Sequence, residues 1–469
     1  MQKFDAVVLG AGPGGYVAAI RLAQLGKSVA LVEEKYWGGV CLNVGCIPTK
    51  ALLKNAEVAY LLREEAAHYG VTGETTIDYS SAFNRSRAVS EGRVKGIHYL
   101  TKKNGITEFE GRGTFQDANT LQVTKTDGTE VVLEFTHAIV ATGASARSIP
   151  GIPFSKRVVN YESQILEAEL PKSIVIVGAG PIGIEFAFVM SAYGTEVTIV
   201  EAQDRILPLE DADTSKELAK ELRKRKIVVH TSAKLQAINE STDSIEVEVL
   251  QLNGEVQTVS AEKAMIAIGF AANVTGYGLE NTGVELSPIK SISVDGLLRT
   301  NVPSIFAIGD VTGKMQLAHV AEHQGVVAAE TIAGLNPEPI EDYRVMPRAI
   351  FTQPQVASFG PTEEQARQEA EATGAELIVS KFNMVANGKA HAIGVPSGYV
   401  KLIADAGTRK LIAAHLVVAD AAELLAELTL ANRAGITIDE LNHNVHIHPS
   451  LSEGIQEAVH GLVGEMINA

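Results

Sequence analysis

The chain holds two cysteines, Cys41 and Cys46, and four residues separate them. On an ideal α-helix a five-residue offset puts two Cα atoms roughly 8.6 Å apart, whereas a disulfide needs about 4.4–6.8 Å. A bridge therefore requires a distorted turn, which Gly45 and the following Pro48 can supply. We expect the helix proper over 51–65. Thiols at or just before its N-terminus would meet the positive end of the helix dipole, which favours the reactive thiolate.

The cysteine pair has three alternatives to redox chemistry. A zinc site wants four ligands, and the chain has no second cysteine pair. Two unrelated buried thiols are a second alternative, although chance seldom places the only two cysteines together beside a Gly-Gly turn. A structural disulfide that closes so short a loop would stabilise little through chain entropy. The motif therefore favours a redox-active pair and no metal site.

A glycine pattern typical of dinucleotide binding begins directly after a predicted strand, 4–9. A predicted helix, 16–25, and a second strand, 28–32, follow, and Glu33 ends this module. The glycines of the G-x-G-x-x-G pattern are Gly10, Gly12 and Gly15. The first allows the tight turn, the second lets the backbone approach a pyrophosphate, and the third lets helix and strand pack closely. The helix N-terminus would bind the diphosphate, and Glu33 the adenosine ribose.

The same module returns after a predicted strand at 173–177 and ends at Glu201. Its glycines are Gly178, Gly180 and Gly183. From first glycine to acid the distance is twenty-three residues in both copies. A duplicated scaffold with one site lost is the alternative, but neither copy lacks a glycine or its acid, so we expect two dinucleotide sites. A carboxylate at Glu201 suits a free 2′-hydroxyl, which favours NAD over NADP, although Arg205 is close in sequence.

Two further strands end at the edge where open α/β sheets bind ligands. One, 137–144, ends in a tight turn at Gly143, and the other ends at Asp310. Asp310 could be a turn former only, but its position favours a cofactor contact. The segment 105–135 alternates like antiparallel strands, and 148–153 is typical of a linker.

From about residue 343 the pattern changes to an α+β module without a dinucleotide motif. It ends in a segment with His448, Ser450 and Glu453, before a predicted helix at 454–466. Ser450 and Glu453 have capping-box spacing, so Glu453 could serve only to begin that helix. Alternatively, Glu453 orients His448 as a proton carrier near neutral pH. The local sequence favours neither.

The bulk numbers exclude several classes of protein. A chain of 469 residues is too long for one core, and its net charge of −16 argues against nucleic-acid binding. No apolar stretch is long enough to span a bilayer, and residues 1–5 run into a strand without room for a signal peptide. Two cysteines in this setting fit a reducing cytoplasm, so we expect a cytoplasmic protein.

Together these motifs resemble the flavin-dependent pyridine nucleotide–disulfide oxidoreductases over essentially the whole chain. The most specific parts are the run 38–48, the paired glycine patterns and the terminal His-x-His-Pro-Ser-x-Ser-Glu. The resemblance implies an α/β fold with two Rossmann-like dinucleotide-binding domains and a C-terminal α+β dimerisation domain. The expected segments are a first FAD-binding part, an NAD-binding domain, a second FAD-binding part and the dimerisation domain. Their predicted bounds are 1–149, 150–272, 273–345 and 346–469.

The resemblance also implies FAD at the first glycine pattern, NAD at the second, and an obligate homodimer. It is nearest to members that oxidise protein-bound dihydrolipoyl groups with NAD, in 2-oxo acid dehydrogenase or glycine cleavage complexes. The implied partners are the lipoyl domains and acyltransferase core of such complexes. A glutathione-type reductase would instead prefer NADPH and have arginines after the second pattern. A non-enzymatic assembly subunit is the rival from another class, against which the intact cysteines and His448 argue.

The resemblance assigns roles to the residues around the cysteines. Cys41 resembles the thiol that meets the lipoyl sulfur, and Cys46 the thiol that lies against the flavin; together they would form the redox disulfide. Lys50, four residues beyond Cys46, matches a lysine near the reactive edge of the flavin. Glu185 matches its ion-pair partner, the alternative being a surface carboxylate in a first helical turn.

The resemblance also places His448 and Glu453 at the disulfide of the other subunit, which favours function over helix capping. Further predicted contacts are Gly113, Thr142, Gly143, Asp310 and Ala318 for FAD, and Gly269 for NAD. The chain departs from many relatives at Phe270, where they have arginine, and at Ser450, where they have threonine.

Overall fold

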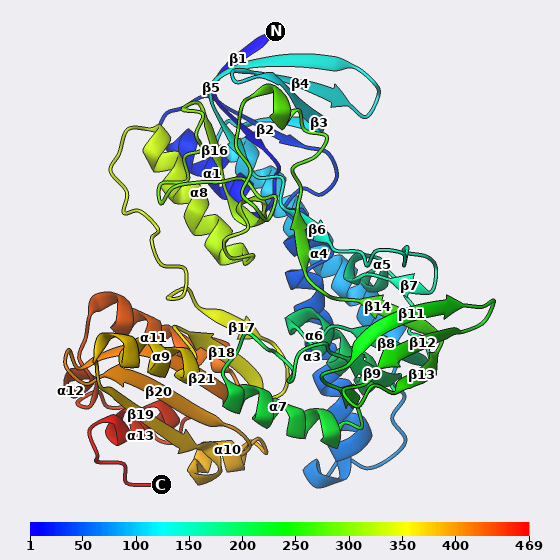
Figure 1. Cartoon of the computed structure of the whole chain (residues 1–469), viewed down its shortest axis with the longest axis vertical. Helices are drawn as coiled ribbons and strands as arrows, with labels where there is room; N and C mark the ends of the chain where they lie inside the picture. Colours follow the sequence, from blue (N-terminus) through cyan, green and yellow to red (C-terminus); the bar gives the residue numbers. More distant parts are fainter. Residues whose placement is uncertain (469) are drawn as a thin grey trace.

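Apolar runs that lead into a glycine form three of the five parallel strands of the first sheet in the computed structural model, which describes residues 1–468. The sheet has parallel strands in the order β3-β2-β1-β5-β16, and the antiparallel strand β4 joins β3 to β5. Its strands are β1 (Gln2–Leu9), β2 (Val29–Glu33), β3 (Thr107–Asp117), β4 (Thr120–Lys125), β5 (Glu130–Val140) and β16 (Ile305–Ala307). Because β16 follows the whole second sheet in sequence, this upper lobe is built from two separate parts of the chain (Figure 1).

Helices α1 (Pro13–Gln24) and α8 (Ala318–Ile332) pack together on this sheet. α1 begins at Pro13, three residues earlier than predicted, because a proline has no N–H to leave unpaired in the first helical turn. The tight glycine turn therefore leads into the helix without a spacer.

The second sheet is fully parallel, in the order β10-β9-β8-β14-β7. Its strands are β7 (Val158–Val159), β8 (Ser173–Val177), β9 (Glu196–Val200), β10 (Val228–His230) and β14 (Lys263–Ile266). Helices α5 (Tyr161–Ile165), α6 (Pro181–Ala192) and α7 (Ala212–Lys224) accompany it, and an antiparallel meander comprises β11 (Lys234–Glu240), β12 (Ile245–Leu250) and β13 (Val256–Ala261). This lobe lies at the lower right of Figure 1.

A two-stranded ribbon joins the two Rossmann-like lobes. β6 (Ala144–Ala146) pairs antiparallel with β15 (Phe270–Ala272), so the outgoing and returning chains run side by side. Beside the ribbon, the Thr142 hydroxyl donates to the backbone oxygen of Asn273 at 2.7 Å, and the Asn273 side-chain amide donates to the oxygen of Thr142 at 3.0 Å. These bonds connect the outgoing and returning chain segments next to the turn at Gly143.

The cysteine segment forms two helices, α2 (Gly39–Asn43) and α3 (Cys46–Tyr60). The predicted helix at 51–65 was therefore placed too late: α3 begins at Cys46, and 61–65 is a π-helix. Pro48 lies inside the first turn, where helical N–H groups have no intrahelical acceptor, so it does not delay the start. α3 packs against α6 and against the long helix α4 (Tyr79–Lys103), and so reaches from one lobe to the other.

The C-terminal lobe is a five-stranded antiparallel sheet in the order β17-β18-β21-β20-β19. Its strands are β17 (Arg348–Ile350), β18 (Gln355–Phe359), β19 (Leu377–Asn383), β20 (Tyr399–Asp405) and β21 (Lys410–Val418). Its helices are α9 (Glu363–Thr373), α10 (Gly388–Ala392), α11 (Ala421–Ala434), α12 (Ile438–Leu441) and α13 (Glu453–Leu462). α13 is shorter than the predicted 454–466. The predicted last segment, 346–469, ends at Ala469, which lies outside the described residues.

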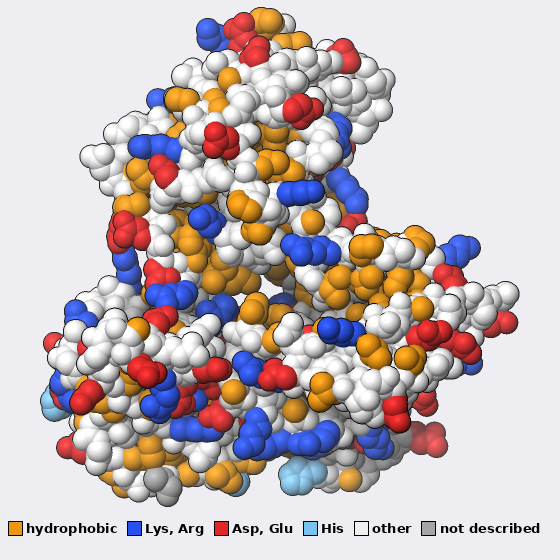
Figure 2. Space-filling view, viewed as in Figure 1, with side chains coloured by type: hydrophobic (Ala, Val, Ile, Leu, Met, Phe, Trp, Pro, Cys, Tyr) orange, Lys and Arg blue, Asp and Glu red, His pale blue; other side chains and the backbone are white. Residues whose placement is uncertain are grey.

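The predicted fold class is confirmed: two Rossmann-like units and a C-terminal α+β unit. The surface is hollowed where the three lobes meet, and acidic and basic side chains are interspersed on the face in Figure 2. Within residues 1–468, no helix has both the length and the apolar character that crossing a membrane requires.

Candidate active site

Each glycine pattern forms a tight turn, and the two turns have nearly the same backbone conformation. Gly10 has φ +105°, and a Cβ there would lie 2.3 Å from the Ala141 oxygen; Gly178 has φ +108°, and a Cβ there would lie 2.4 Å from the Ala267 oxygen. Only glycine fits such a backbone against a neighbouring carbonyl. Each turn therefore brings a helix N-terminus to the carboxyl end of its sheet, where an anionic diphosphate can bind.

The acid that ends each module binds its own glycine turn. Glu33 accepts from the Ala11 N–H at 2.8 Å, and Glu201 accepts from the Ala179 N–H at 2.7 Å. The other oxygen of Glu201 accepts from the Gln203 N–H at 2.8 Å. Since a carboxylate has about four acceptor positions, each acid keeps capacity for a ribose hydroxyl.

The two cysteines lie on either side of a break between α2 and α3. Gly45, at φ −125° and ψ −118°, separates the helices, so Cys46 is the first residue of α3. Both cysteines are free thiols. The interaction with the Cys46 thiol, and then burial, raises the pKa of Cys41. The interaction with Cys41, followed by the charge of Lys50, lowers the pKa of Cys46, which favours the thiolate on Cys46.

An ion pair between lobes stands beside the thiols. Lys50 Nζ lies 2.9 Å and 3.1 Å from the two carboxylate oxygens of Glu185 on α6. Glu185 is only 5% exposed, so its alternative as a surface carboxylate is wrong. The backbone N–H of Phe351 donates to Glu185 at 2.9 Å, and Lys50 Nζ lies 4.6 Å from the Phe351 ring centroid. Sequence reasoning missed Phe351, because no local signal links it to a residue 166 positions earlier.

One cavity of about 1490 Å³ brings most of the predicted site residues together. Both glycine turns, both cysteines and the Lys50–Glu185 pair line it. The other predicted residues in its wall are Glu33, Gly113, Thr142, Gly143, Glu201, Gly269, Asp310 and Ala318. Gly183 does not line the cavity: a Cβ there would lie 2.1 Å from the Gly178 oxygen, so it serves close packing of helix and strand. The cavity size, the two helix N-termini and the two acids fit two dinucleotides.

Asp310 sits at the wall between the glycine turn and α8. It lies in a 3-10 turn (Gly309–Thr312), whose Gly309 N–H donates to the Gln324 side chain at 2.6 Å. Burial raises the pKa of Asp310 to about 6. A carboxyl poised in this way can accept or donate a hydrogen bond, which suits contact with sugar hydroxyls.

His448 and Glu453 lie outside this cavity. His448 Nδ1 is 2.8 Å from one Glu453 oxygen, while the Ser450 N–H donates to the other at 2.8 Å. Glu453 therefore orients the imidazole. The predicted capping box is not formed, because α13 begins at Glu453 itself, and its N-cap is Ser452, whose side chain makes no capping hydrogen bond. Burial opposes ionisation, but the Ser450 amide and His448 hold the pKa of Glu453 below its usual value. The His448 side chain is 80% exposed, so its reactive nitrogen is accessible to another molecule.

A second histidine–glutamate pair, His446 with Glu427 on α11, was not predicted from the sequence. His446 Nε2 lies 3.0 Å and 3.1 Å from the two Glu427 oxygens, and this contact raises the pKa of His446. The His446 side chain is only 7% exposed. In the sequence, the only sign of this pair was the position of His446 two residues before His448, because Glu427 lies on a separate helix.

Known proteins match this chain over its whole length. It is 57% identical over 468 residues to the dihydrolipoyl dehydrogenase of Mycobacterium tuberculosis, covering 100% of both chains. It is 49% identical over 468 residues to that of Corynebacterium glutamicum, covering 100% of this chain and 99% of the other.

Among solved structures, LpdA from Mycobacterium tuberculosis matches at a TM-score of 0.89 with 28% identity, covering 98% and 100% of the two chains. A Cu(II) complex of RclA, an HOCl-induced flavoprotein disulfide reductase from Escherichia coli, matches at 0.87 with 27% identity, covering 98% and 99%.

The family models agree with these matches. Residues 4–325 match the pyridine nucleotide-disulphide oxidoreductase family, and residues 346–459 match the dimerisation domain of the same family. The chain is therefore an FAD- and NAD-dependent oxidoreductase, and it belongs to the pyridine nucleotide-disulphide oxidoreductase family.

Proposed function

We propose that the chain is a dihydrolipoyl dehydrogenase, which oxidises protein-bound dihydrolipoyl groups to the lipoyl disulfide and reduces NAD. The observation that carries this proposal is the single cavity that the cysteine pair shares with both glycine turns. Electrons that enter at the thiols thus have a short route to a nucleotide. The dihydrolipoyl substrate itself is supported by relatives of that name at 49–57% identity over the full chain.

The first glycine turn, Glu33, Asp310 and the N-terminus of α8 would hold FAD, and the second turn with Glu201 would hold NAD. The flavin, when bound, supplies the two-electron chemistry that links thiol oxidation to nicotinamide reduction. The chain's own task is to place the thiols beside it. Lys50, fixed by buried Glu185, keeps positive charge close to Cys46.

The chain performs the first half of the reaction by thiol–disulfide exchange. His448 takes a proton from one dihydrolipoyl thiol, and the resulting thiolate attacks Cys41 of a Cys41–Cys46 disulfide. Cys46 leaves as a thiolate, which Lys50 and the N-terminus of α3 stabilise. The second dihydrolipoyl sulfur then attacks the mixed disulfide, releasing Cys41 as a thiol and closing the lipoyl ring. The substrate loses two electrons, and the cysteine pair gains them.

The homodimer completes this site in the proposal. His448 is exposed and lies outside the cavity of its own chain, so each subunit's His448 serves the disulfide of the other. The dimerisation domain at 346–459 supports this arrangement. The further partners are the lipoyl domains and acyltransferase core of a 2-oxo acid dehydrogenase or glycine cleavage complex. The proposed location is the cytoplasm, based on cysteine usage.

A steady-state assay of the purified holoenzyme with dihydrolipoamide, comparing NAD with NADP, tests the proposal. We expect turnover with NAD and a clear preference for it over NADP. An enzyme that ignores dihydrolipoamide but reduces another disulfide with NADPH would replace this function by that of a different reductase.

His448→Ala tests the proton-transfer role. It should lower dihydrolipoamide turnover by about 10²- to 10⁴-fold, the usual contribution of general acid–base catalysis, with FAD still bound. His443→Ala, at another exposed histidine, is the matched control and should retain normal turnover. Equal turnover of the two variants would remove His448 from the mechanism.

A further inference from the structure

The loop between β9 and α7, residues 201–211, forms one wall of the nucleotide cavity. Glu201, Leu207, Leu209 and Glu210 all line it. Leu207 has φ +46°, a left-handed backbone that a leucine seldom adopts, and its side chain is buried. A strained residue of this kind persists only where its surroundings hold it.

The first anchor of this loop is the second glycine turn itself. The Leu207 N–H donates to the backbone oxygen of Ala179 at 2.9 Å, and Ala179 lies between Gly178 and Gly180. The Glu210 N–H donates back to the Leu207 oxygen at 2.9 Å. A shift of the loop near Glu210 would therefore displace, through these hydrogen bonds, the glycine turn that is expected to bind the nucleotide diphosphate.

The second anchor is the C-terminal lobe. Glu210 accepts from Arg348 Nε at 3.2 Å and from the Ser358 hydroxyl at 2.7 Å. Asp211 accepts from the Glu363 N–H at 2.9 Å. The loop thus connects the second glycine turn to the C-terminal lobe. Figure 1 shows α7 lying between the second sheet and the C-terminal lobe.

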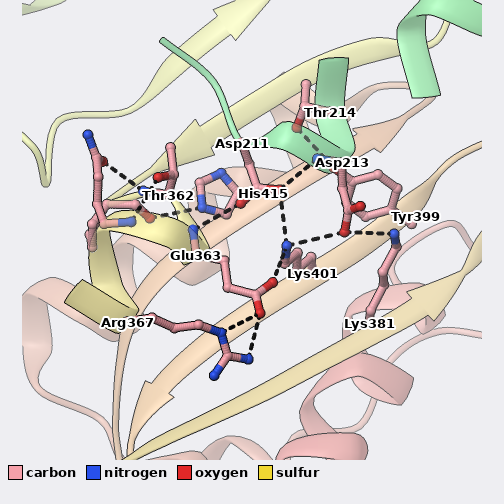
Figure 3. Close-up of polar contacts among 12 residues, drawn as sticks. Asp211, Asp213, Thr214, Thr362, Glu363, Arg367, Lys381, Tyr399, Lys401 and His415 are labelled. Atoms are coloured by element: carbon pink, nitrogen blue, oxygen red, sulfur yellow. Dashed lines mark hydrogen bonds and ion pairs between the residues drawn. The ribbon is translucent and has the colours of Figure 1, made fainter. Parts of the chain in front are cut away.

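Lys401 on β20 is the centre of this second anchor. Its Nζ lies 3.0 Å from Asp211 and 3.2 Å from Asp213 and also contacts the Glu363 carboxylate, and its side chain is 4% exposed (Figure 3). Burial opposes the charge, but Glu363 and Asp211 hold the pKa of Lys401 above its usual value. One buried cation therefore unites three carboxylates from two lobes, and removing it would leave buried charge uncompensated.

Further side-chain contacts surround Lys401 where the start of α7 meets the C-terminal lobe, a contact region that we call the Lys401 seam. Lys381 Nζ lies 2.9 Å from Asp213 and 4.3 Å from the Tyr399 ring centroid, and the Tyr399 and Thr214 hydroxyls lie 2.9 Å apart. His415 Nε2 lies 3.0 Å from the Pro361 oxygen. The start of α7 is thus fixed to β19 and β20 through side chains alone.

We propose that Lys401 is a positioning residue for the pyridine nucleotide: by clamping Asp211 and Asp213 it sets the β9–α7 loop against the second glycine turn. The C-terminal lobe then controls nucleotide affinity without touching the nucleotide. This inference rests on the proposed binding of NAD at the second glycine turn.

The test compares Lys401→Met with the wild-type holoenzyme. We expect the Kd for NADH, from fluorescence titration, to rise about tenfold, within the usual range of coupling between sites. The KM for NAD should rise with it, whereas FAD content and the KM for dihydrolipoamide stay unchanged. An unchanged Kd in folded Lys401→Met, or parallel changes in both KM values, would overturn the proposal.

Gln353→Ala is the matched control. Arg225, just beyond the other end of α7, donates to the Gln353 side chain at 3.1 Å, so this variant removes a contact between the same lobes away from the loop. It should leave the Kd for NADH within about twofold of wild type, and a tenfold rise would contradict a role specific to the Lys401 seam.

If Lys401→Met does not fold with FAD bound, Asp213→Asn is the variant that tests the proposal. Asp213 is partly exposed, and its loss leaves Lys401 paired with two carboxylates. It should raise the Kd for NADH about threefold, and an unchanged value would overturn the proposal. Failure of wild-type enzyme to bind NADH would instead reject the proposed function.

Discussion

The two glycine turns have nearly the same backbone, yet their surroundings differ. At the first turn, a Cβ on Gly39 would lie 2.6 Å from the Gly12 Cα, and the Gly38 N–H donates to the Ala11 oxygen at 2.9 Å. The segment that leads to the cysteines therefore packs directly on this turn. The second turn has the matching hydrogen bond, from the Leu207 N–H to the Ala179 oxygen at 2.9 Å, but a Cβ on Gly180 would meet nothing within 4 Å.

One repeated module can thus serve two purposes. A turn that the chain itself covers suits a cofactor that stays bound and must lie beside the thiols. An open turn suits a nucleotide that enters and leaves with each turnover. Substitutions at the thiols, the turns and their acids test this contrast, beginning with the largest expected effect.

Removing either thiol should abolish the thiol chemistry but leave nucleotide binding at the second turn intact. Cys41→Ser and Cys46→Ser should lower dihydrolipoamide turnover by more than about 10³-fold, because each sulfur takes part in bond exchange. NADH binding and some NADH oxidation by artificial acceptors should remain, since the second turn is intact. Steady-state assays with both substrates measure this, and equal loss of both activities would contradict the electron path from thiols to nucleotide.

Adding one methyl group to each turn should affect different ligands. Gly180→Ala has room for its Cβ, so it should fold with normal FAD content, while the KM for NAD rises about 10- to 30-fold, equal to about 1.4–2 kcal/mol. Gly12→Ala, whose Cβ would lie 3.9 Å from the Gly39 Cα, should instead lower FAD retention. Flavin absorbance and NAD kinetics distinguish the two, and the reverse pattern would exchange our cofactor assignments.

Changing the acid of each module should alter cofactor choice at the second turn only. Glu201→Gln should reduce the preference for NAD over NADP about tenfold, because a carboxylate there repels a 2′-phosphate and accepts from a 2′-hydroxyl. Glu33→Gln is the control and should keep the wild-type NAD/NADP ratio. The ratio of kcat/KM values measures the effect, and an unchanged ratio in Glu201→Gln would place nucleotide selection elsewhere.

The smallest effect concerns the thiolate. The Cys41 hydrogen bond lowers the pKa of Cys46, so Cys41→Ala should raise it and shift the midpoint of ultraviolet thiolate absorbance to higher pH. Lys50→Met should act in the same direction, because it removes the cation that favours the thiolate. Lys54→Met, which alters an exposed lysine paired with Glu57, should leave the midpoint in place. A downward shift in Cys41→Ala would contradict the assignment of the thiolate to Cys46.

Local spacing predicted what short segments determine by themselves. The glycine turns, their acids and the break at Gly45 all depend on a few neighbouring residues, and the structure has the expected backbone there. Helix starts were predicted too late at Pro13 and Cys46, because proline is tolerated throughout the first turn.

Contacts between distant segments could not be predicted in this way. Glu185 accepts a hydrogen bond from the backbone N–H of Phe351, 166 positions away, and Lys401 pairs with Asp211, 190 positions away. Glu453 presented two alternatives in sequence, and the structure favours the contact with His448, since α13 begins at Glu453 and has no side-chain cap. Such contacts arise from how the lobes pack, which no single segment encodes.

A crystal structure of the holoenzyme soaked with NAD would decide where the two nucleotides bind. We predict FAD at the turn of Gly10–Gly15 with its ring against Cys46, and NAD at the turn of Gly178–Gly183 beside Glu201. A flavin ring remote from both cysteines, or FAD bound at the second turn, would contradict this prediction.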